Sequence, residues 1–238
     1  MLSAKKCAKN KRRYVLVKLQ LESNVIRHLL KNMYFINGTA YAGKSTMVRL
    51  LSEKYDGIQC GENYHDELMS AIDTKHQPNL SYFETMTSWQ EFIGRTPEEY
   101  DAWIVGGARE AADLEIAKLI QLSAQNRKVF VDTNIPISIL KEIADFHHVA
   151  IMLSPQSLSV ERFFDREDED KQFIYQQIQK AQDPVKAMEN YKNCLAKVNS
   201  LEHYKEYEES GFYTYIRNED STISKAMAAI EKHFMLHI

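Results

Sequence analysis

One loop constrains the fold of this chain more than any other feature: Gly-Thr-Ala-Tyr-Ala-Gly-Lys-Ser, from Gly38 to Ser45. Its glycines permit a tight loop whose backbone N–H groups point inward, where they can bind the oxygens of an anion. A helix that begins at Lys44 would present its positive N-terminus to the same anion. In this spacing the lysine reaches the β- and γ-phosphates of a nucleotide, and the serine hydroxyl ligates Mg²⁺. The sequence therefore predicts a nucleotide-phosphate site made of Gly38, Thr39, Ala40, Tyr41, Ala42, Gly43, Lys44, Ser45 and Thr46.

The sequence on either side of this loop supports that interpretation. Residues 33–37, Met-Tyr-Phe-Ile-Asn, form a short apolar run typical of a buried strand. Residues 44–55 carry apolar side chains at helical spacing and end near Asp56-Gly57, which is a helix stop signal. The motif requires this order of strand, loop and helix. The alternative is a glycine turn followed by an ordinary surface lysine.

The rest of the chain alternates between apolar runs and helical patterns. We expect further strands at 58–60, 128–132, 148–153 and 212–216, and helices at 136–146, 158–180, 184–209 and 221–236. Thr96-Pro97-Glu98-Glu99 is a capping box, so another helix begins there and runs to about 122. Gly106-Gly107 inside it would mark a bend, a close approach of a ligand, or a break. Alternating strands and helices imply a parallel sheet covered on both faces.

The domain organisation follows from the same patterns. Residues 1–32 are a basic tail and a lead-in segment, whose part from 14 to 31 fits a strand or a helix equally well. We interpret the tail as solvated, with a contact to nucleic acid or membrane as the alternative. Residues 33–238 form one domain, in which 61–127 is a helical insertion for substrate binding and 159–180 is a mobile lid. The lid prediction depends on the exposed acidic stretch from Glu167 to Asp170.

Composition excludes several classes of protein. The 238 residues contain 30 Lys and Arg against 33 Asp and Glu, which is the wrong balance for a general nucleic-acid binder. No apolar run is long enough for a membrane helix. Three widely separated cysteines exclude a disulfide framework and a Cys-x-x-Cys zinc site. We expect a cytoplasmic protein, as a monomer or a homodimer, without a membrane partner.

Two further groups of residues carry chemistry. Asp132 ends an apolar strand, where its carboxylate would hold Mg²⁺ together with Ser45; a turn or capping role is the alternative. Arg162 and Arg166 lie four positions apart, so they share one helix face and could clamp phosphoryl oxygens. Salt bridges to the neighbouring acidic residues are the alternative there. These residues are Asp165, Glu167 and Glu169.

Taken together, the phosphate loop, the strand ending in Asp132, the Arg-x-x-x-Arg helix and the closing strand and helix resemble the P-loop small-molecule kinases. The similar families are shikimate kinase, adenylate kinase and chloramphenicol phosphotransferase. The resemblance covers residues 33–236 in element order, and its specific motif is the phosphate loop. It implies an α/β fold with a doubly wound, five-stranded parallel sheet in the order 2-3-1-4-5. It also implies an ATP-dependent phosphotransferase that uses Mg²⁺ and acts on a small-molecule or nucleotide-like acceptor.

The resemblance also implies roles for individual residues. Arg162 would pack on the adenine, Arg166 would reach the phosphates, and Arg217 would border the adenine. On the acceptor side, Asp66 would be the base, with Glu62 as the next candidate and a helix N-cap as the alternative role of Asp66. Arg109 would bind an anionic group of the acceptor, unless it pairs with Asp113 on its own helix.

Other features narrow the substrate. The loop lacks the additional glycines and the Gly-Lys-Gly-Thr ending of adenylate kinases, which disfavours AMP as the acceptor. The chain has no Asn-Lys-x-Asp guanine motif and no LSGGQ-type signature, which disfavours GTPases and transporter ATPases. The alternative function is a nucleotide-binding P-loop ATPase, or a regulatory or binding module without a phosphoacceptor. The aromatic residues of the insertion suit a base or a sugar ring, but core packing explains them equally well; they are Tyr82, Phe83, Trp89 and Trp103.

Overall fold

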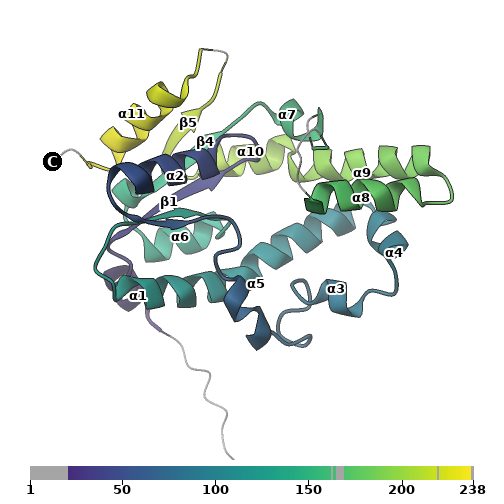
Figure 1. The fold of residues 1–238 in the computed structure, drawn as a ribbon, viewed down its shortest axis with the longest axis horizontal. Helices are drawn as coiled ribbons and strands as arrows, with labels where there is room; N and C mark the ends of the chain where they lie inside the picture. Colours follow the sequence, from purple (N-terminus) through teal and green to yellow (C-terminus); the bar gives the residue numbers. More distant parts are fainter. Residues whose placement is uncertain (1–20, 162, 165–168, 219, 237–238) are drawn as a thin grey trace, which may run out of the picture.

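Five parallel strands form the central sheet of the protein (Figure 1). The structure is a computed structural model that describes residues 21–161, 163–164, 169–218 and 220–236. The strands lie in the order β2-β3-β1-β4-β5, and each neighbouring pair is parallel. This order confirms the predicted α/β architecture. The strands are β1 (Met33–Gly38), β2 (Ile58–Cys60), β3 (Val129–Asp132), β4 (Val149–Leu153) and β5 (Tyr213–Ile216).

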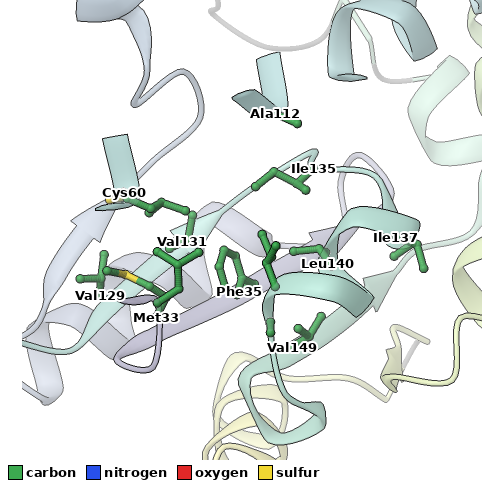
Figure 2. Close-up of a cluster of buried hydrophobic side chains, with 14 of the residues drawn as sticks. Met33, Phe35, Cys60, Ala112, Val129, Val131, Ile135, Ile137, Leu140 and Val149 are labelled. Carbon is green, nitrogen blue, oxygen red and sulfur yellow. The ribbon is translucent and has the colours of Figure 1, made fainter. Parts of the chain in front are cut away.

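Alternate side chains of the strands enter two separate hydrophobic clusters, so both faces of the sheet are buried. Phe35 and Val131 belong to the first cluster, in which Figure 2 shows them gathered with Leu140 and Ala112 from helices that cover this face. Ile36 and Phe130, each the neighbour of one of these residues, belong to the second. Because successive side chains of a strand point to opposite faces, continuous apolar runs become a sheet with a core on each side.

Helices cover both faces. The helices within the described residues are α1 (Ser23–Leu29), α2 (Lys44–Lys54), α3 (Tyr82–Thr85), α4 (Trp89–Ile93), α5 (Pro97–Ser123), α6 (Ile137–Ile143), α7 (Gln156–Glu161), α8 (Glu169–Gln179), α9 (Pro184–Val198), α10 (Leu201–Glu208) and α11 (Ile223–His233). Helices α2 and α11 pack on one face, and α5 and α6 pack on the other. A third hydrophobic cluster joins α4, α8, α9 and the first part of α5 beside the sheet.

The long helix α5 begins as the sequence predicts. The Thr96 side chain accepts a hydrogen bond from the Glu99 N–H, and the Glu99 side chain accepts one from the Thr96 N–H. The helix then continues through Gly106 and Gly107 without a break, so the break considered from the sequence is wrong. A Cβ atom on Gly106 would lie 2.5 Å from Nδ2 of Asn79. The close approach at this glycine therefore comes from the protein's own loop before α3.

Two predicted helices are each divided in the structure. The pattern at 158–180 forms α7 and α8, and the pattern at 184–209 forms α9 and α10. Ser200 begins α10 by accepting a hydrogen bond from the His203 N–H, which explains the second division. In the lead-in segment, residues 23–29 form a helix, whereas the tail up to residue 20 lies outside the described residues. Within the described part of the chain, no helix has the length and apolar character needed to cross a membrane.

Candidate functional site

The phosphate loop connects β1 to α2 at the carboxyl edge of the sheet, and its backbone requires glycine. Gly38 has φ +128° and Gly43 has φ +96°, and Tyr41 between them has φ +63°. A Cβ atom on Gly38 would lie 1.9 Å from the carbonyl oxygen of Met152 in β4. The Thr39 N–H donates to the same carbonyl oxygen at 3.0 Å. The start of the loop is thus packed directly against the backbone of β4.

Residues from the second half of the chain hold the loop in shape. The buried Ser154 donates its N–H to Oγ1 of Thr39 at 2.9 Å and its hydroxyl to the Ala40 carbonyl at 2.7 Å. Arg217, which follows β5, donates from Nη1 to the Tyr41 carbonyl at 3.0 Å. No side chain of the described residues caps the N-terminus of α2. The first N–H groups of α2 are therefore available to an anion.

Lys44, Ser45 and Asp132 meet at this loop, as the sequence predicts. Ser45 donates its hydroxyl to Oδ2 of Asp132 at 2.6 Å, and Nζ of Lys44 lies 3.9 Å from Oδ1. Lys44 also donates to the carbonyl of Thr39 at 3.4 Å. The Asp132 side chain is only 1% exposed. Burial raises its pKa above the ordinary value, and the nearby Lys44 ammonium opposes that rise.

This arrangement fits a magnesium ion. The carboxylate of Asp132 and the hydroxyl of Ser45 are hard oxygen ligands, which Mg²⁺ prefers. Oδ1 of Asp132 is buried without a hydrogen-bond partner, so one ligand oxygen is available. No group of three or more His, Cys, Asp or Glu suited to a metal occurs in the described ranges, so this would be a site completed by phosphate oxygens and water.

The two carboxylates predicted as base candidates, Asp66 and Glu62, have different surroundings in the structure. Asp66 is exposed at the start of a 3₁₀ helix (Asp66–Ala71), whose N-cap position is occupied by His65. The N-cap role considered for Asp66 is therefore wrong. Glu62 is also exposed, but its charge contributes to the raised pKa of Asp132, after the larger effect of burial. Glu62, the second candidate, is thus within electrostatic range of the predicted metal ligand.

Sequence reasoning missed a buried polar cluster next to Asp132. Glu115 of α5 is 4% exposed, and its Oε2 accepts hydrogen bonds from the Tyr64 hydroxyl at 2.7 Å and the Thr133 hydroxyl at 2.6 Å. Its Oε1 lies 3.9 Å from Nδ1 of His65, which is also buried. Burial raises the pKa of Glu115, and the charge of Asp132 adds to this effect. The sequence does contain a signal for this cluster, because Glu115 is a single glutamate among the apolar residues Ala111, Ala112 and Leu119 of the buried helix face.

The predicted arginines have different outcomes. Arg162 and Arg166 lie outside the described residues. Arg109 is exposed on α5 and forms no ion pair with Asp113 in the part of the chain that the structure describes. Arg217 lies at the carboxyl end of β5 and contacts the phosphate loop itself.

Helix α8, in the predicted lid, bridges the phosphate loop and the insertion. Nζ of Lys171 lies 5.8 Å from the ring centroid of Tyr41, and Phe173 meets Trp89 of α4 edge to face at 4.8 Å. Glu169 and Asp170 are exposed, as expected for a lid. However, Ile178 is fully buried, so the expectation of exposure is wrong for the end of the segment.

The aromatic residues of the insertion pack on one another. Tyr82, Phe83, Trp89 and Trp103 are linked by ring contacts in which Phe92 also takes part, and the Arg95 guanidinium lies 3.7 Å from the Tyr82 ring centroid. A cavity of about 450 Å³ opens beside them, and none of its lining residues belongs to the phosphate loop. The lining residues are Asn79, Tyr82, Glu91, Gly94, Arg95, Glu99, Ala102 and Trp103.

Comparison with family models and with curated proteins adds no relative to this picture. No model of a known family matches the chain, and no curated protein matches it. The function of the protein is therefore inferred from the geometry of its site.

Proposed function

We propose that this protein is a Mg²⁺-dependent phosphotransferase of the P-loop kinase type, which transfers the γ-phosphoryl group of ATP to a small molecule. The observation that carries the proposal is the meeting of Lys44, Ser45 and Asp132 beside a left-handed glycine loop. A lone glycine-rich loop could be a turn. The buried carboxylate of Asp132, which accepts a hydrogen bond from Ser45 and lies near the Lys44 ammonium, supports a site for a nucleotide and its metal.

In this proposal, the chain's own groups position the phosphates. The loop N–H groups and the N-terminus of α2 bind phosphate oxygens, and Lys44 turns from the Thr39 carbonyl toward the transferred group. Ser45 and Asp132 hold the metal, which when bound neutralises charge that develops on the phosphates. Because Lys44 and Asp132 are both largely buried, their charges act in a region of low dielectric, where they are strong.

An enzyme is favoured over a binding module because of carboxylates on the acceptor side. Phosphoryl transfer needs a group that orients the acceptor and takes its proton, whereas nucleotide binding alone does not. Glu62 lies within electrostatic range of Asp132, and Glu115 does so from α5. The resemblance supplies the rest of the proposal, in which Arg162 and Arg166 belong to a lid that covers ATP and Arg109 and the insertion bind the acceptor.

A nucleotide and metabolite screen by thermal shift, followed by ADP release on the hits, tests the proposal. Mg·ATP should raise the melting temperature of the wild type more than that of Lys44→Ala at the same concentration. Lys192→Ala, an exposed lysine on α9, is the matched control and should respond as the wild type does. Equal responses in all three proteins would contradict the nucleotide site. Binding without ADP release on any screened acceptor would favour the binding module.

A further inference from the structure

The buried cluster around Glu115 joins the loop after β2 to the residue that follows Asp132. Strand β2 pairs with β3 in parallel, with Cys60 opposite Val131, so the loop after Cys60 emerges beside Asp132 at the same edge of the sheet. Strand β1 pairs with β3 on its other side, with Ile36 opposite Asp132, and leads into the phosphate loop. An acceptor that approaches the γ-phosphate from the β2 side would therefore meet residues of the loop after β2.

One carboxylate holds that loop to the end of β3. Oε2 of Glu115 accepts from Tyr64 at 2.7 Å and from Thr133 at 2.6 Å, which leaves Oε1 directed at His65. The gap between Oε1 and Nδ1 of His65 is 3.9 Å, and Nδ1 is buried without a hydrogen-bond partner. Movement of the ring by about 1 Å would make this a hydrogen bond. Glu115 is thus placed to orient the imidazole of His65.

We propose that His65 accepts the proton of the phosphoacceptor hydroxyl and that Glu115 is the positioning residue that orients its ring. This inference rests on the proposed phosphotransferase function. With Nδ1–H donated to Glu115, the lone pair of the neutral ring lies on Nε2. Nε2 makes no hydrogen bond with any residue that the structure describes, so it is the ring nitrogen open to a ligand. Asp66, by contrast, is an exposed residue with no such partner within those ranges.

The step balances. The acceptor oxygen forms a bond to the γ-phosphorus, while the bond from that phosphorus to the bridging oxygen breaks and ADP leaves with the electron pair. The acceptor proton moves to Nε2 of His65, which becomes an imidazolium, and the Glu115 carboxylate stabilises that charge, as in other His–carboxylate pairs. The titratable groups that act on the pair directly or through Tyr64 are Tyr64 itself, Cys60 at the end of β2 and Asp132 of β3. Further out, Lys118 of α5 acts on Cys60 and pairs with Glu67, and Glu62 acts on Asp132.

Turnover of His65→Gln separates this role from a structural one. The measurement is ADP release from Mg·ATP, with the best acceptor from the screen or with water as the acceptor. We expect turnover to fall by about 10²–10⁴-fold, while affinity for a non-hydrolysable ATP analogue stays within about two-fold. The decrease of kcat at low pH, which we call the acidic limb of the pH profile, should disappear in His65→Gln and shift to a different pH in Glu115→Gln. Tyr64→Phe, which removes one donor to Glu115 but leaves His65, should retain the limb.

Nitrogen-15 NMR of the histidine rings tests the geometry without any acceptor. The His65 signals are assigned by their absence from His65→Gln. In the wild type they should show a proton on Nδ1 and none on Nε2, and Glu115→Gln should change this pattern. A proton on Nε2 in the neutral ring, or a turnover profile unchanged in His65→Gln, would overturn the inference and leave the proposed function standing. Failure of the wild type to bind Mg·ATP would overturn both.

Discussion

Ser45 donates a 2.6 Å hydrogen bond to Asp132, a residue 87 positions further along the chain. The sheet makes this contact possible, because Asp132 lies opposite Ile36 in the β1–β3 register, and Ile36 is two residues before the phosphate loop begins. The bond joins the helix that follows the loop to the strand that carries the predicted metal ligand. The serine hydroxyl thus satisfies one oxygen of a buried carboxylate whose other oxygen lies 3.9 Å from the Lys44 ammonium.

Asp132→Asn should weaken the dependence of activity on Mg²⁺ while the fold stays intact. The amide still accepts the Ser45 hydrogen bond, but it is a poorer ligand for a hard cation. The measurement is a Mg²⁺ titration of ADP release, with circular dichroism to monitor folding. Asp113→Asn, at an exposed position of α5, serves as the control and should titrate like the wild type. An unchanged titration in Asp132→Asn would assign Asp132 to a structural role.

Lys44→Ala should reduce the affinity for Mg·ATP. The variant loses one charge-assisted contact to phosphate, typically about 1.5–3 kcal/mol, which corresponds to roughly 10- to 150-fold in Kd. Isothermal calorimetry with a non-hydrolysable analogue measures this directly, and Lys192→Ala is again the matched surface variant. Equal affinities in Lys44→Ala and the wild type would contradict the assignment of the loop.

Gly38→Ala should destabilise the protein, whereas Gly107→Ala should not. A Cβ atom at Gly38 meets the Met152 carbonyl at 1.9 Å, and its φ of +128° disfavours any L side chain. We expect a loss of at least the roughly 1–3 kcal/mol typical of such backbone strain. At Gly107 no atom lies within 4 Å of an added Cβ, so alanine should stabilise α5 by about 0.5–1 kcal/mol. Urea unfolding of both variants measures the contrast, and similar effects in the two would contradict the loop geometry.

Glu115→Gln should change how stability depends on pH. Burial raises the pKa of Glu115 above its value in the unfolded chain. The folded state therefore loses stability as pH rises through that raised pKa, because the unfolded state releases the proton more readily. Glutamine removes this loss, so the variant should gain thermal stability relative to the wild type as pH rises from about 4 to 8. Glu84→Gln, at an exposed position, should run parallel to the wild type across the same series of melting curves.

Hydrogen exchange should divide α8 into two parts. The exposed start, at Glu169 and Asp170, lies near Lys171, whose ammonium sits above the Tyr41 ring of the phosphate loop. We expect this part to gain protection when a non-hydrolysable ATP analogue binds. The end, at Gln177 and Ile178, is buried and should be protected with or without the analogue. High protection of the start in the free protein, unchanged by nucleotide, would exclude a lid.

Features that neighbouring residues determine could be predicted from the sequence. Features that depend on contacts between distant segments could not. The phosphate loop and the strand ending in Asp132 were predictable because glycine spacing and uninterrupted apolar runs specify the backbone directly. The contact between Glu115 and His65 was not predictable, because it exists only where α5 covers the loop after β2. Gly106 is a second example, because the side chain that would crowd a Cβ atom there belongs to Asn79, 27 positions away. The division at Ser200 did have a local signal, a serine immediately before a helical run.

The hydrogen bond from Arg217 to the Tyr41 carbonyl has a consequence for the order of synthesis. The loop at residues 38–45 leaves the ribosome early, but Met152, Ser154 and Arg217, which hold it in shape, follow more than a hundred residues later. A nascent chain therefore carries the complete glycine motif long before the loop has the contacts that shape it. If the loop binds ATP as proposed, the nucleotide would stabilise the growing polypeptide only after β4 and Arg217 have been translated and β4 has joined the sheet.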